Sequence, residues 1–252
     1  MSFATYPSLA GRVVLVTGGA SGIGADIVRA FAGQGSKIAF LDIMDEAAVA
    51  LCDELAAAAP LYLRCDLTDV DALKAAIGTV REKLGPIGVL VNNAGNDDRR
   101  AIDAVTVDYW DKIQAINLRA QFFAAQAVHP QMRELGDGSI INFSSIVWRL
   151  GADTMPAYAT AKAAIHGMTG SLAKAFGADG IRVNTVEPGA VMTDKQLKLW
   201  YTEQAQVDAM IARQMLKRVL LADEVARAVL FLAADDSRMI TKQTIRVDAG
   251  LR

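Results

Sequence analysis

Tyr158 and Lys162 form the pair of residues in this 252-residue sequence whose types and spacing most directly suggest a reaction. They stand four positions apart in a segment of helical character, so both side chains project from one face of a helix. A phenol has an ordinary pKa near 10 and is a poor base at neutral pH. An ammonium about 4 Å away stabilises the phenolate by about 4 kcal/mol at an effective dielectric constant near 20, or roughly 3 pK units. The pair therefore predicts a tyrosine that accepts a proton near pH 7.

Ser145 precedes Tyr158 by 13 residues and follows the run S-I-I-N-F at 139–143, which we expect to form a strand. Its hydroxyl would lie at the carboxyl end of that strand, where it can hold a substrate oxygen beside the phenol. Ser144 is its direct neighbour, and spacing alone does not choose between the two. Asn117, in a further helical segment, is a candidate for anchoring a water that relays the proton.

A glycine-rich segment, T-G-G-A-S-G-I-G at 17–24, lies directly between an expected strand and an expected helix. Glycines let the backbone turn tightly and approach a pyrophosphate, and the free N–H groups at the start of the helix attract its negative charge. The spacing is G-x-x-x-G-x-G, not the G-x-G-x-x-G of the commoner dinucleotide motif. A tight turn without a ligand is the alternative, but the position between strand and helix favours a dinucleotide site.

Asp42 ends the next expected strand, close to the expected ~20 residues beyond the glycine segment. Open α/β folds bind ligands at this edge, where a carboxylate accepts hydrogen bonds from the ribose hydroxyls of NAD and repels the 2′-phosphate of NADP. The glycine segment contains no Arg or Lys, and Lys37 stands at the far end of the strand. We therefore predict NAD as the cofactor. Asp66, after the third expected strand, is a candidate partner of the adenine amino group, with a helix cap as its alternative.

Short β-branched runs alternate with longer Ala-rich amphipathic segments, which is typical of strand–helix units on a parallel sheet. The run V-V-L-V is apolar at every position, so both faces of its strand should be covered by helices. No linker interrupts the pattern. Residues 1–252 are therefore predicted to form a single α/β domain with a Rossmann-like, doubly wound sheet of seven parallel strands. We expect strands at 12–17, 37–42, 61–65, 87–92, 138–143, 181–186 and 243–247, and helices that include 22–34, 69–84, 117–135 and 156–177.

The charge balance excludes several partners. Lys and Arg number 26 and Asp and Glu 28, and both signs are spread along the chain. Nucleic-acid binding draws on clustered basic residues, so neither nucleic acid nor a membrane surface is expected as a partner. No apolar run approaches the about 20 residues that a membrane-spanning helix needs, and no signal peptide is expected at the start. Cys52 and Cys65 lack disulfide or C-x-x-C spacing, which favours a reducing cytoplasm.

Metal and acyl-transfer chemistry have no motif in the sequence. The two histidines, His129 and His166, have no second ligand at metal spacing, so no metal site is predicted. The G-x-S-x-G nucleophile elbow of hydrolases is absent as well.

Taken together, these residues resemble the short-chain dehydrogenase/reductase family over essentially the whole chain. The glycine segment matches the cofactor loop of that family, N-N-A-G at 92–95 matches its next motif, and the 13-residue spacing to Tyr158 selects Ser145. The resemblance implies the strand order 3-2-1-4-5-6-7 and a homotetramer. It also implies a catalytic tetrad of Asn117, Ser145, Tyr158 and Lys162. The cofactor-binding residues are then expected to be Gly18, Ser21, Gly22, Ile23, Gly24, Asp42, Asp66, Leu67, Asn93, Ala94, Gly95, Tyr158, Lys162, Pro188, Gly189, Val191 and Thr193.

Three positions depart from the family pattern. Glu187 is unusual before the proline of the segment that contacts the nicotinamide. Lys242 and Ala249 replace glycines in the C-terminal motifs T-G-Q and V-D-G-G. The last two substitutions put the local turn geometry in doubt more than the catalysis.

The segments expected to line a substrate pocket are polar. N-D-D-R-R at 96–100 follows the fourth strand, where carboxylates and amides suit hydroxyl-rich ligands. Trp148 and Arg149 are candidates for a stacking platform and a charged donor, and 196–206 fits the position of a mobile lid. Each also has a simpler interpretation as a solvated loop or an interface residue. The predicted substrate residues are Asn96, Asp97, Ser145, Trp148, Arg149 and Tyr158.

The segments 96–99, 197–202 and 247–250 are more particularly similar to those of bacterial aldose 1-dehydrogenases within this family. The implied activity is an NAD-dependent oxidoreductase that oxidises an aldose, a pentose or deoxyhexose, at C1 to its lactone. Tyr158 would remove the hydroxyl proton while hydride passes to NAD.

Three alternatives remain open. The first is oxidation of a secondary hydroxyl on a keto-deoxy sugar acid, with Arg99 or Arg149 holding the carboxylate. The second is a 3-oxoacyl reductase, against which Asp42 and the polar loop argue. The third is a non-catalytic nucleotide-binding scaffold, which would be expected to have lost part of the tetrad.

Overall fold

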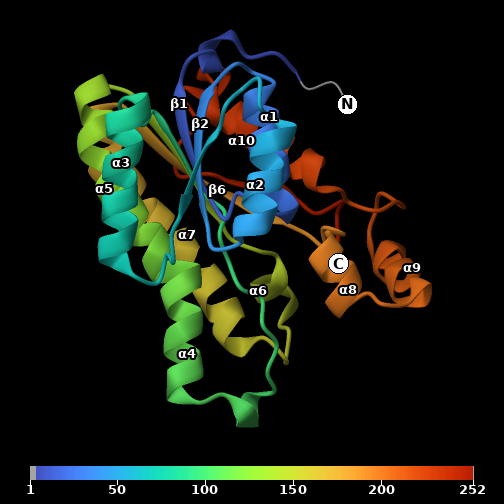
Figure 1. Cartoon of the computed structure of the whole chain (residues 1–252). Helices are drawn as coiled ribbons and strands as arrows, with labels where there is room; N and C mark the ends of the chain where they lie inside the picture. Colours follow the sequence, from blue (N-terminus) through green and yellow to red (C-terminus); the bar gives the residue numbers. More distant parts are fainter. Residues whose placement is uncertain (1–3, 252) are drawn as a thin grey trace.

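One sheet of seven parallel strands forms the centre of the chain in a computed structural model, which describes residues 4–251 (Figure 1). The strand order is β3-β2-β1-β4-β5-β6-β7, as the family resemblance implies, and every neighbouring pair is parallel. The predicted α/β class is confirmed, and each expected strand coincides with an observed one to within two residues at either end. The strands are β1 (Val13–Thr17), β2 (Lys37–Asp42), β3 (Leu61–Arg64), β4 (Val89–Asn92), β5 (Gly138–Phe143), β6 (Ile181–Pro188) and β7 (Thr244–Val247).

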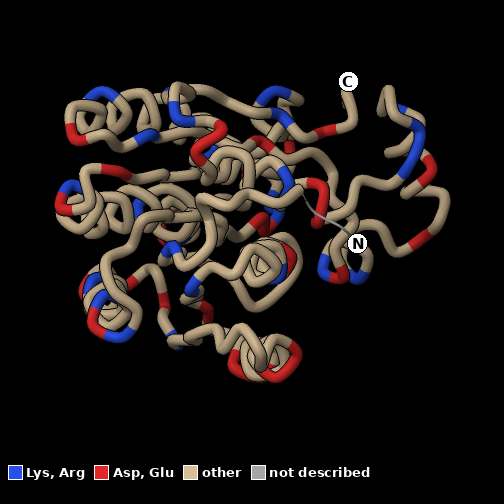
Figure 2. Tube along the Cα trace, turned by 90° about the horizontal axis from the view of Figure 1, so that it is seen from above, with Lys and Arg blue, Asp and Glu red and all other residues tan. Residues whose placement is uncertain are grey.

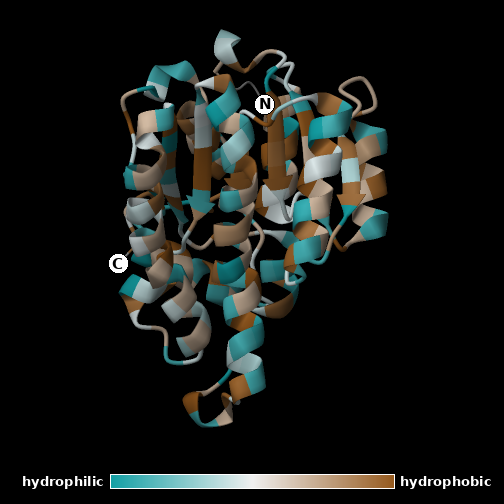
Figure 3. Ribbon diagram, turned by 90° about the vertical axis from the view of Figure 1, so that its left-hand side faces the viewer, coloured by the Kyte–Doolittle hydropathy of each residue, from teal (hydrophilic) through white to brown (hydrophobic). Residues whose placement is uncertain are grey.

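Helices cover both faces of the sheet (Figure 1). One face carries α1 (Gly22–Ala32), α2 (Asp45–Glu54) and α10 (Ala222–Ala233), and the other carries α3 (Val70–Leu84), α5 (Ala120–Leu135) and α7 (Pro156–Phe176). Figure 3 shows apolar strands inside and polar residues on the outer surfaces of the helices. All residues of β1 are buried, as the uninterrupted apolar run predicts for a strand covered on both faces.

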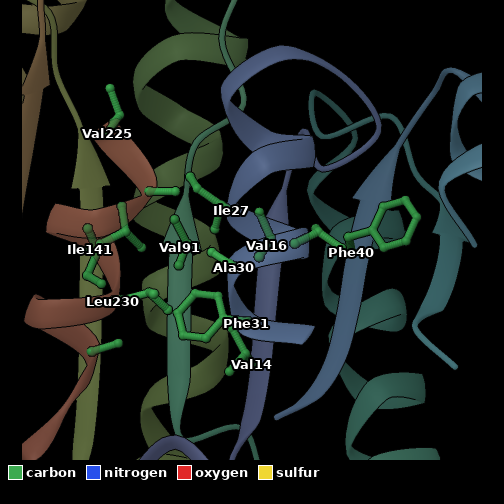
Figure 4. Close-up of a cluster of buried hydrophobic side chains, with 14 of the residues drawn as sticks. Val14, Val16, Ile27, Ala30, Phe31, Phe40, Val91, Ile141, Val225 and Leu230 are labelled. Carbon is green, nitrogen blue, oxygen red and sulfur yellow. The ribbon is translucent and has the colours of Figure 1, made fainter. Parts of the chain in front are cut away.

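The cluster on the α1 side of the sheet fixes the position of the first strand–helix unit (Figure 4). Phe31 of α1 is fully buried in this cluster together with Val14 of β1, Val91 of β4 and Leu230 of α10. Close packing of this kind tolerates little displacement. The turn between β1 and α1, which contains the glycine segment, is therefore held on a rigid base.

The more irregular segments gather at the carboxyl ends of the strands. They follow β4, β5 and β6 in the chain and occupy the lower half of Figure 1, with α4 at the bottom and α8 and α9 at the right. They comprise α4 (Val107–Gln114), α6 (Val147–Leu150), α8 (Asp194–Leu199) and α9 (Gln204–Arg213). Short helical turns complete the elements: η1 (Pro7–Leu9), η2 (Ile102–Ala104), η3 (Ala115–Arg119), η4 (Gly177–Asp179) and η5 (Asp235–Ser237).

The helix expected at 117–135 differs from the observed one at its start. Residues Ala115–Arg119 form a π-helical turn, η3, between α4 and α5. Asn117 lies in this turn, and its side chain donates to the carbonyl of Ile113 in the preceding α4. Such π turns are frequent at functional sites, and a periodicity of apolar residues does not register them.

Lys242 and Ala249, which stand where the family pattern has glycine, keep the backbone conformation of a glycine turn. Lys242 and Ala249 have φ of +61° and +55°, in the left-handed region. Non-glycine residues adopt this region only at an energetic cost. The turn geometry therefore survives these substitutions.

Charges of both signs are spread along the trace, and the charged residues of α2 are all acidic (Figure 2). Within residues 4–251, no helix combines the length and apolarity that crossing a membrane requires.

Candidate active site

The glycine-rich segment forms a tight turn at the start of α1. Gly18 and Gly22 have φ of +65° and +52°, which favours glycine at both positions. A Cβ on Gly24 would lie 1.8 Å from the Gly18 carbonyl oxygen, so no side chain fits there. Ser21 is the N-cap residue of α1, and its side chain makes no capping hydrogen bond to the first turn. The turn thus presents backbone N–H groups at a helix N-terminus, as a pyrophosphate requires. Ile23, in the first turn, packs against the buried core.

Asn93 and Thr17 brace this turn from the end of β4. The Asn93 amide donates to the carbonyl oxygens of Thr17 and Gly18 at 3.1 and 2.9 Å. The Thr17 hydroxyl accepts a hydrogen bond from the Ala94 N–H at 3.1 Å. The structure therefore places Asn93 and Ala94 against the glycine turn, and Thr17, which the sequence analysis does not single out as a binding residue, joins the two segments.

Asp42 lies beside the same turn, at the carboxyl end of β2. Its carboxylate accepts hydrogen bonds from the backbone N–H groups of Ala20, Ile43 and Met44 at 2.8 to 3.1 Å. The nearest basic residue across the strand pair, Arg64, forms an ion pair with Asp45. The carboxylate is thus held in one position next to the helix N-terminus.

Asp66 and Leu67 follow β3. The Asp66 carboxylate accepts hydrogen bonds from the Thr68 N–H and hydroxyl, and the former lowers the pKa of Asp66 most. Leu67 is buried in the core on the α3 side. The cap of α3 is Asp69, whose side chain accepts from two N–H groups of the helix. Asp66 is therefore not the cap of α3, and its carboxylate stabilises a local turn instead.

The Ser145 side chain lies close enough to the Tyr158 hydroxyl to lower the pKa of the phenol, against the effect of burial. Ser144 has other partners: its hydroxyl donates to the Lys162 carbonyl at 2.7 Å and contacts His166 Nε2 at 3.0 Å. The structure therefore brings Ser145, and not Ser144, to the phenol. A substrate oxygen at this place would meet both hydroxyls.

Lys162 lies beneath the phenol. Its Nζ atom is 5.5 Å from the centroid of the Tyr158 ring and donates to the Phe143 carbonyl at 2.8 Å. Burial lowers the pKa of Lys162 to about 7, although the charge of Asp97 opposes this. Burial also raises the pKa of Tyr158, the charge of Asp97 adds to that shift, and the hydrogen bond from Ser145 opposes it.

The sequence-based expectation that the ammonium brings the phenol pKa near 7 is therefore wrong for the protein on its own. Burial penalises the charged form of both groups, so it favours the neutral phenol and the neutral amine. Lys162 therefore stabilises the phenolate less than a fully charged ammonium about 4 Å away would. A further positive charge near Tyr158 is needed to favour the phenolate.

Gly95 leaves room between Asn117 and Lys162. A Cβ at this position would lie 2.9 Å from Asn117 Oδ1 and 3.4 Å from Lys162 Nζ. The fully buried Asn117 side chain also accepts from the Asn96 N–H and donates to the Asn96 carbonyl, both at 3.0 Å. Asn117 thus ties η3 to the loop after β4, close to the lysine.

The segment after β6 approaches the glycine turn. A Cβ on Gly22 would lie 3.3 Å from Thr193 Cγ2. The Thr193 hydroxyl caps α8, and Val191 is buried and bridges to Leu220. A Cβ on Gly189, next to Pro188, would lie 2.7 Å from Asp248 Cα, so glycine is required for that close approach. The segment after β6 therefore lies directly against the glycine turn.

Asp97 connects the loop after β4 with α8. Its carboxylate accepts hydrogen bonds from Lys195 Nζ at 2.5 Å and Gln196 Nε2 at 2.6 Å. Burial opposes ionisation of Asp97, but the hydrogen bond and charge of Lys195 and the hydrogen bond of Gln196 keep its pKa below the ordinary value. A carboxylate therefore stands in the predicted substrate wall, within electrostatic range of Tyr158.

Trp148 and Arg149 occupy a different environment from the one expected. The Arg149 guanidinium bonds to Glu187 at 2.6 Å and lies over the Trp148 ring, 4.2 Å from its centroid. Glu187 is fully buried. His166 packs against Trp148 and lies 3.8 Å from the Glu187 carboxylate. The guanidinium of Arg149 is thus paired with Glu187, the unusual residue before the proline. Spacing in the sequence does not reveal this pairing.

The donor set matches a dinucleotide better than a metal ion. Among residues 4–251, no group of three or more His, Cys, Asp and Glu side chains could hold a metal ion. The backbone N–H groups of the glycine turn and the fixed carboxylate of Asp42 are the groups that would hold a nicotinamide dinucleotide, whose pyrophosphate and ribose hydroxyls match them.

Comparison with known proteins supports this interpretation of the site. The family model described as enoyl-(acyl carrier protein) reductase matches residues 18–252. The chain is 49% identical to a probable galactose dehydrogenase, GalD, of Rhizobium meliloti (strain 1021), over 98% of this chain and 97% of that protein. It is 48% identical to D-xylose 1-dehydrogenase of Caulobacter vibrioides (strain NA1000 / CB15N), over the full length of both. The crystal structure of a putative short-chain alcohol dehydrogenase from Sinorhizobium meliloti 1021 superimposes with a TM-score of 0.91 at 30% identity, covering 97% of this chain and 98% of that one.

The chain belongs to the short-chain dehydrogenase/reductase family. It is an oxidoreductase that acts on CH–OH groups and uses a nicotinamide cofactor.

Proposed function

We propose that this protein oxidises an aldose, a pentose or deoxyhexose, at C1 to its lactone with NAD as the cofactor. The observation that carries the proposal is the pairing of Tyr158 and Ser145 beside a wall formed by Asn96 and Asp97, because carboxylates and amides suit a ligand rich in hydroxyls. The relatives named galactose dehydrogenase and D-xylose 1-dehydrogenase support the same substrate class.

In this proposal Ser145 and Tyr158 hold the anomeric oxygen between their hydroxyl groups. Tyr158 takes the proton of that hydroxyl as the C1–H bond breaks and a C1=O bond forms. A bound oxidised nicotinamide supplies the hydride acceptor and a positive charge. Lys162, anchored on the Phe143 carbonyl, fixes the phenol from below, and Asn117 holds the neighbouring loop where a water can pass the proton on.

NAD is the proposed cofactor because of Asp42. Its carboxylate is fixed by three backbone N–H groups, so it cannot swing away from a 2′-phosphate. Arg64, the nearest cation along the strand pair, is already neutralised by Asp45. A 2′-phosphate would therefore meet an uncompensated negative charge, whereas ribose hydroxyls would donate to it.

We further propose a homotetramer in the cytoplasm. Large apolar side chains on η2 and α4 support association: Ile102 is 71% exposed and Val107 75% exposed. Unpaired Cys52 and Cys65 support a reducing compartment. Light scattering of the purified protein tests the assembly, and a monomeric mass at micromolar concentration would refute it.

The test of the proposed function is a screen of the purified protein with pentoses, hexoses, deoxy-sugars and sugar acids, each with NAD and with NADP. We expect reduction of NAD with at least one neutral aldose and trapping of the product by hydroxylamine as the hydroxamate of a lactone. Comparable kcat/KM with both cofactors would refute the assignment of NAD. Turnover of sugar acids alone would favour the keto-deoxy sugar acid alternative, and turnover of carrier-bound 3-oxoacyl groups alone would favour the reductase.

A further inference from the structure

Arg99 and Trp200 contact each other from segments about a hundred residues apart. Arg99 lies in the loop after β4, and Trp200 follows α8 directly. The carbon of the Arg99 guanidinium lies 4.0 Å from the centroid of the Trp200 ring. A cation over an indole face is favourable and holds both planes in a fixed relation.

Each of these two side chains has a buried donor without a protein acceptor. Arg99 Nε and Trp200 Nε1 are two of the five buried side-chain nitrogen and oxygen atoms in residues 4–251 that have no hydrogen-bond partner. Leaving a buried donor unpaired costs roughly 1–3 kcal/mol, so such groups in native proteins call for an explanation. Two of them in one contact indicate a place prepared for acceptor oxygens.

The contact is linked to Asp97 from both sides, because Arg99 follows Asp97 by two residues and Trp200 follows Gln196, a partner of Asp97, by four. The charge of Asp97 acts on the phenol of Tyr158, whereas Arg99 acts on Tyr201, next to Trp200. Asp97 is also held by Gln196, one turn of chain before Trp200. A ligand with its reacting carbon at Tyr158 would therefore reach Arg99 and Trp200 with its other end.

We propose that Arg99 Nε and Trp200 Nε1 form a donor subsite for ring hydroxyl oxygens on the part of the aldose remote from C1. This inference rests on the proposed function. Both groups only donate, so the ligand must supply acceptors, as hydroxyl oxygens do. A carboxylate would supply acceptors too, but Asp97 and Asp98 directly precede Arg99 and disfavour a further anion. The other cation considered for such a role, Arg149, is engaged by Glu187.

The first test removes a single N–H group. Trp200→Phe keeps an aromatic face for Arg99 and deletes the indole donor. We expect the KM for the aldose to rise about 3- to 10-fold, the range for one lost hydrogen bond, with kcat within twofold and the KM for NAD unchanged. The matched control is Trp110→Phe on α4, which alters an exposed indole outside the site. An unchanged KM in Trp200→Phe would overturn the proposal.

The second test separates contact from structure with deoxy-sugars. If Trp200 bonds to one ring hydroxyl, the analogue that lacks this hydroxyl should show a raised KM with the wild-type protein and no further rise with Trp200→Phe. Other analogues should show the full effect of the mutation, by the logic of a double-mutant cycle. The same factor for every analogue would mean that Trp200 only supports the fold, and would overturn the proposal.

The Arg99 side is tested in parallel. Arg99→Gln should raise the KM for the aldose, whereas Arg100→Gln, a neighbouring change at a side chain that lies over Tyr109, should not. Equal effects of the two substitutions would argue for a change of the whole loop and against the subsite.

A binding measurement distinguishes failure of the subsite from failure of the proposed function. If the wild-type protein turns over no aldose, the proposed function fails, and calorimetry with D-galactose, D-xylose and D-galactonate in the presence of NADH decides on the subsite. Binding of a neutral sugar that Trp200→Phe weakens supports it. Binding of the sugar acid alone, or no difference between the two proteins, overturns it.

Discussion

The two halves of the cleft are built in different ways. On the cofactor side, the turn after β1 is formed by glycines, braced by Asn93 and placed next to a carboxylate that three backbone N–H groups satisfy. On the substrate side, single side chains from distant segments meet, and two of them keep buried donors without a protein partner. The first half is fixed by backbone and packing, while the second is held by pairwise polar contacts.

Substrate specificity can therefore change on the substrate side without loss of the fold. A backbone turn at a helix N-terminus binds what all dinucleotides share, so it tolerates little variation. The side chains of Asp97 and Arg99 are held in place by a few contacts with α8 and with Trp200. Substitution there should change which ligand binds and leave the sheet intact. The following variants test that contrast.

The largest effect is expected on the cofactor side, from Gly24→Ala. The added Cβ would lie 1.8 Å from the Gly18 carbonyl oxygen, so the turn must open. We expect the affinity for NADH, measured by fluorescence titration, to fall on the order of 100-fold or more. Gly33→Ala is the control at the other end of α1, because φ there is −64° and the nearest contacts are ordinary. A Kd within threefold of the wild-type value would contradict a backbone-built site.

A second effect is expected at the ion pair of Arg149 with Glu187, which occupies the guanidinium that the sequence predicts as a substrate contact. Arg149→Ala leaves the fully buried Glu187 without its guanidinium. Glu187 is buried but the Arg149 side chain is 38% exposed, so we expect a cost of about 1–3 kcal/mol, below that of a fully buried pair, which urea unfolding should detect. The double variant Arg149→Ala with Glu187→Gln should recover part of the loss. A change below about 1 kcal/mol would show that the pair carries no structural role.

The pH dependence of stability should reveal the buried lysine. Lys162 has a pKa of about 7 in the folded protein and 10.5 as its ordinary value, so the unfolded chain binds more protons between these pH values. The stability of the protein without cofactor should therefore rise from pH 7 to 9 by ~1.4 kcal/mol per pH unit from this group. Below pH 7 this slope vanishes, because Lys162 is then protonated in both states and its burial destabilises the fold in full.

The variant Lys162→Met should remove this slope. Lys174→Met, an exposed lysine on the same helix, is the control and should retain it. Parallel stability curves for Lys162→Met and the wild-type protein would contradict the lowered pKa.

The smallest effect is expected at the C-terminal turn. Ala249 has φ of +55°, a conformation that costs a non-glycine residue roughly 1–2 kcal/mol, part of which glycine loses again through greater freedom in the unfolded chain. Ala249→Gly should therefore stabilise the protein by about 0.5–1 kcal/mol, measured by denaturant unfolding. Destabilisation would show that the methyl group contributes more than the strain costs.

The sequence predicts the sheet well because apolar runs and helix periodicity reflect burial directly. The strand at 12–17 is one residue longer than β1, and the order of the strands follows from the family pattern carried by the glycine segment and the tetrad. The π-helical turn at Asn117 is the exception, because a periodic pattern of apolar residues does not distinguish it from the α-helices on either side.

The site is less accessible from the sequence where it depends on contacts between distant segments. The pairing of Arg149 with Glu187 and the stacking of Arg99 on Trp200 join residues 38 and about a hundred positions apart, and no spacing rule relates them. The ionisation of Tyr158 and Lys162 cannot be predicted from their spacing for a related reason. A separation along a helix gives the distance between two charges, but their burial depends on the surrounding fold.

The central claim is that the Tyr158 phenol accepts the proton of the substrate hydroxyl. The most direct test is kcat of Tyr158→Phe with the aldose that the wild-type protein oxidises, together with the Kd for NADH. We predict a fall in kcat of about 10²- to 10⁴-fold, the usual contribution of a positioned acid–base group, with the Kd for NADH within twofold of the wild-type value. A kcat within tenfold of the wild-type value would contradict the claim.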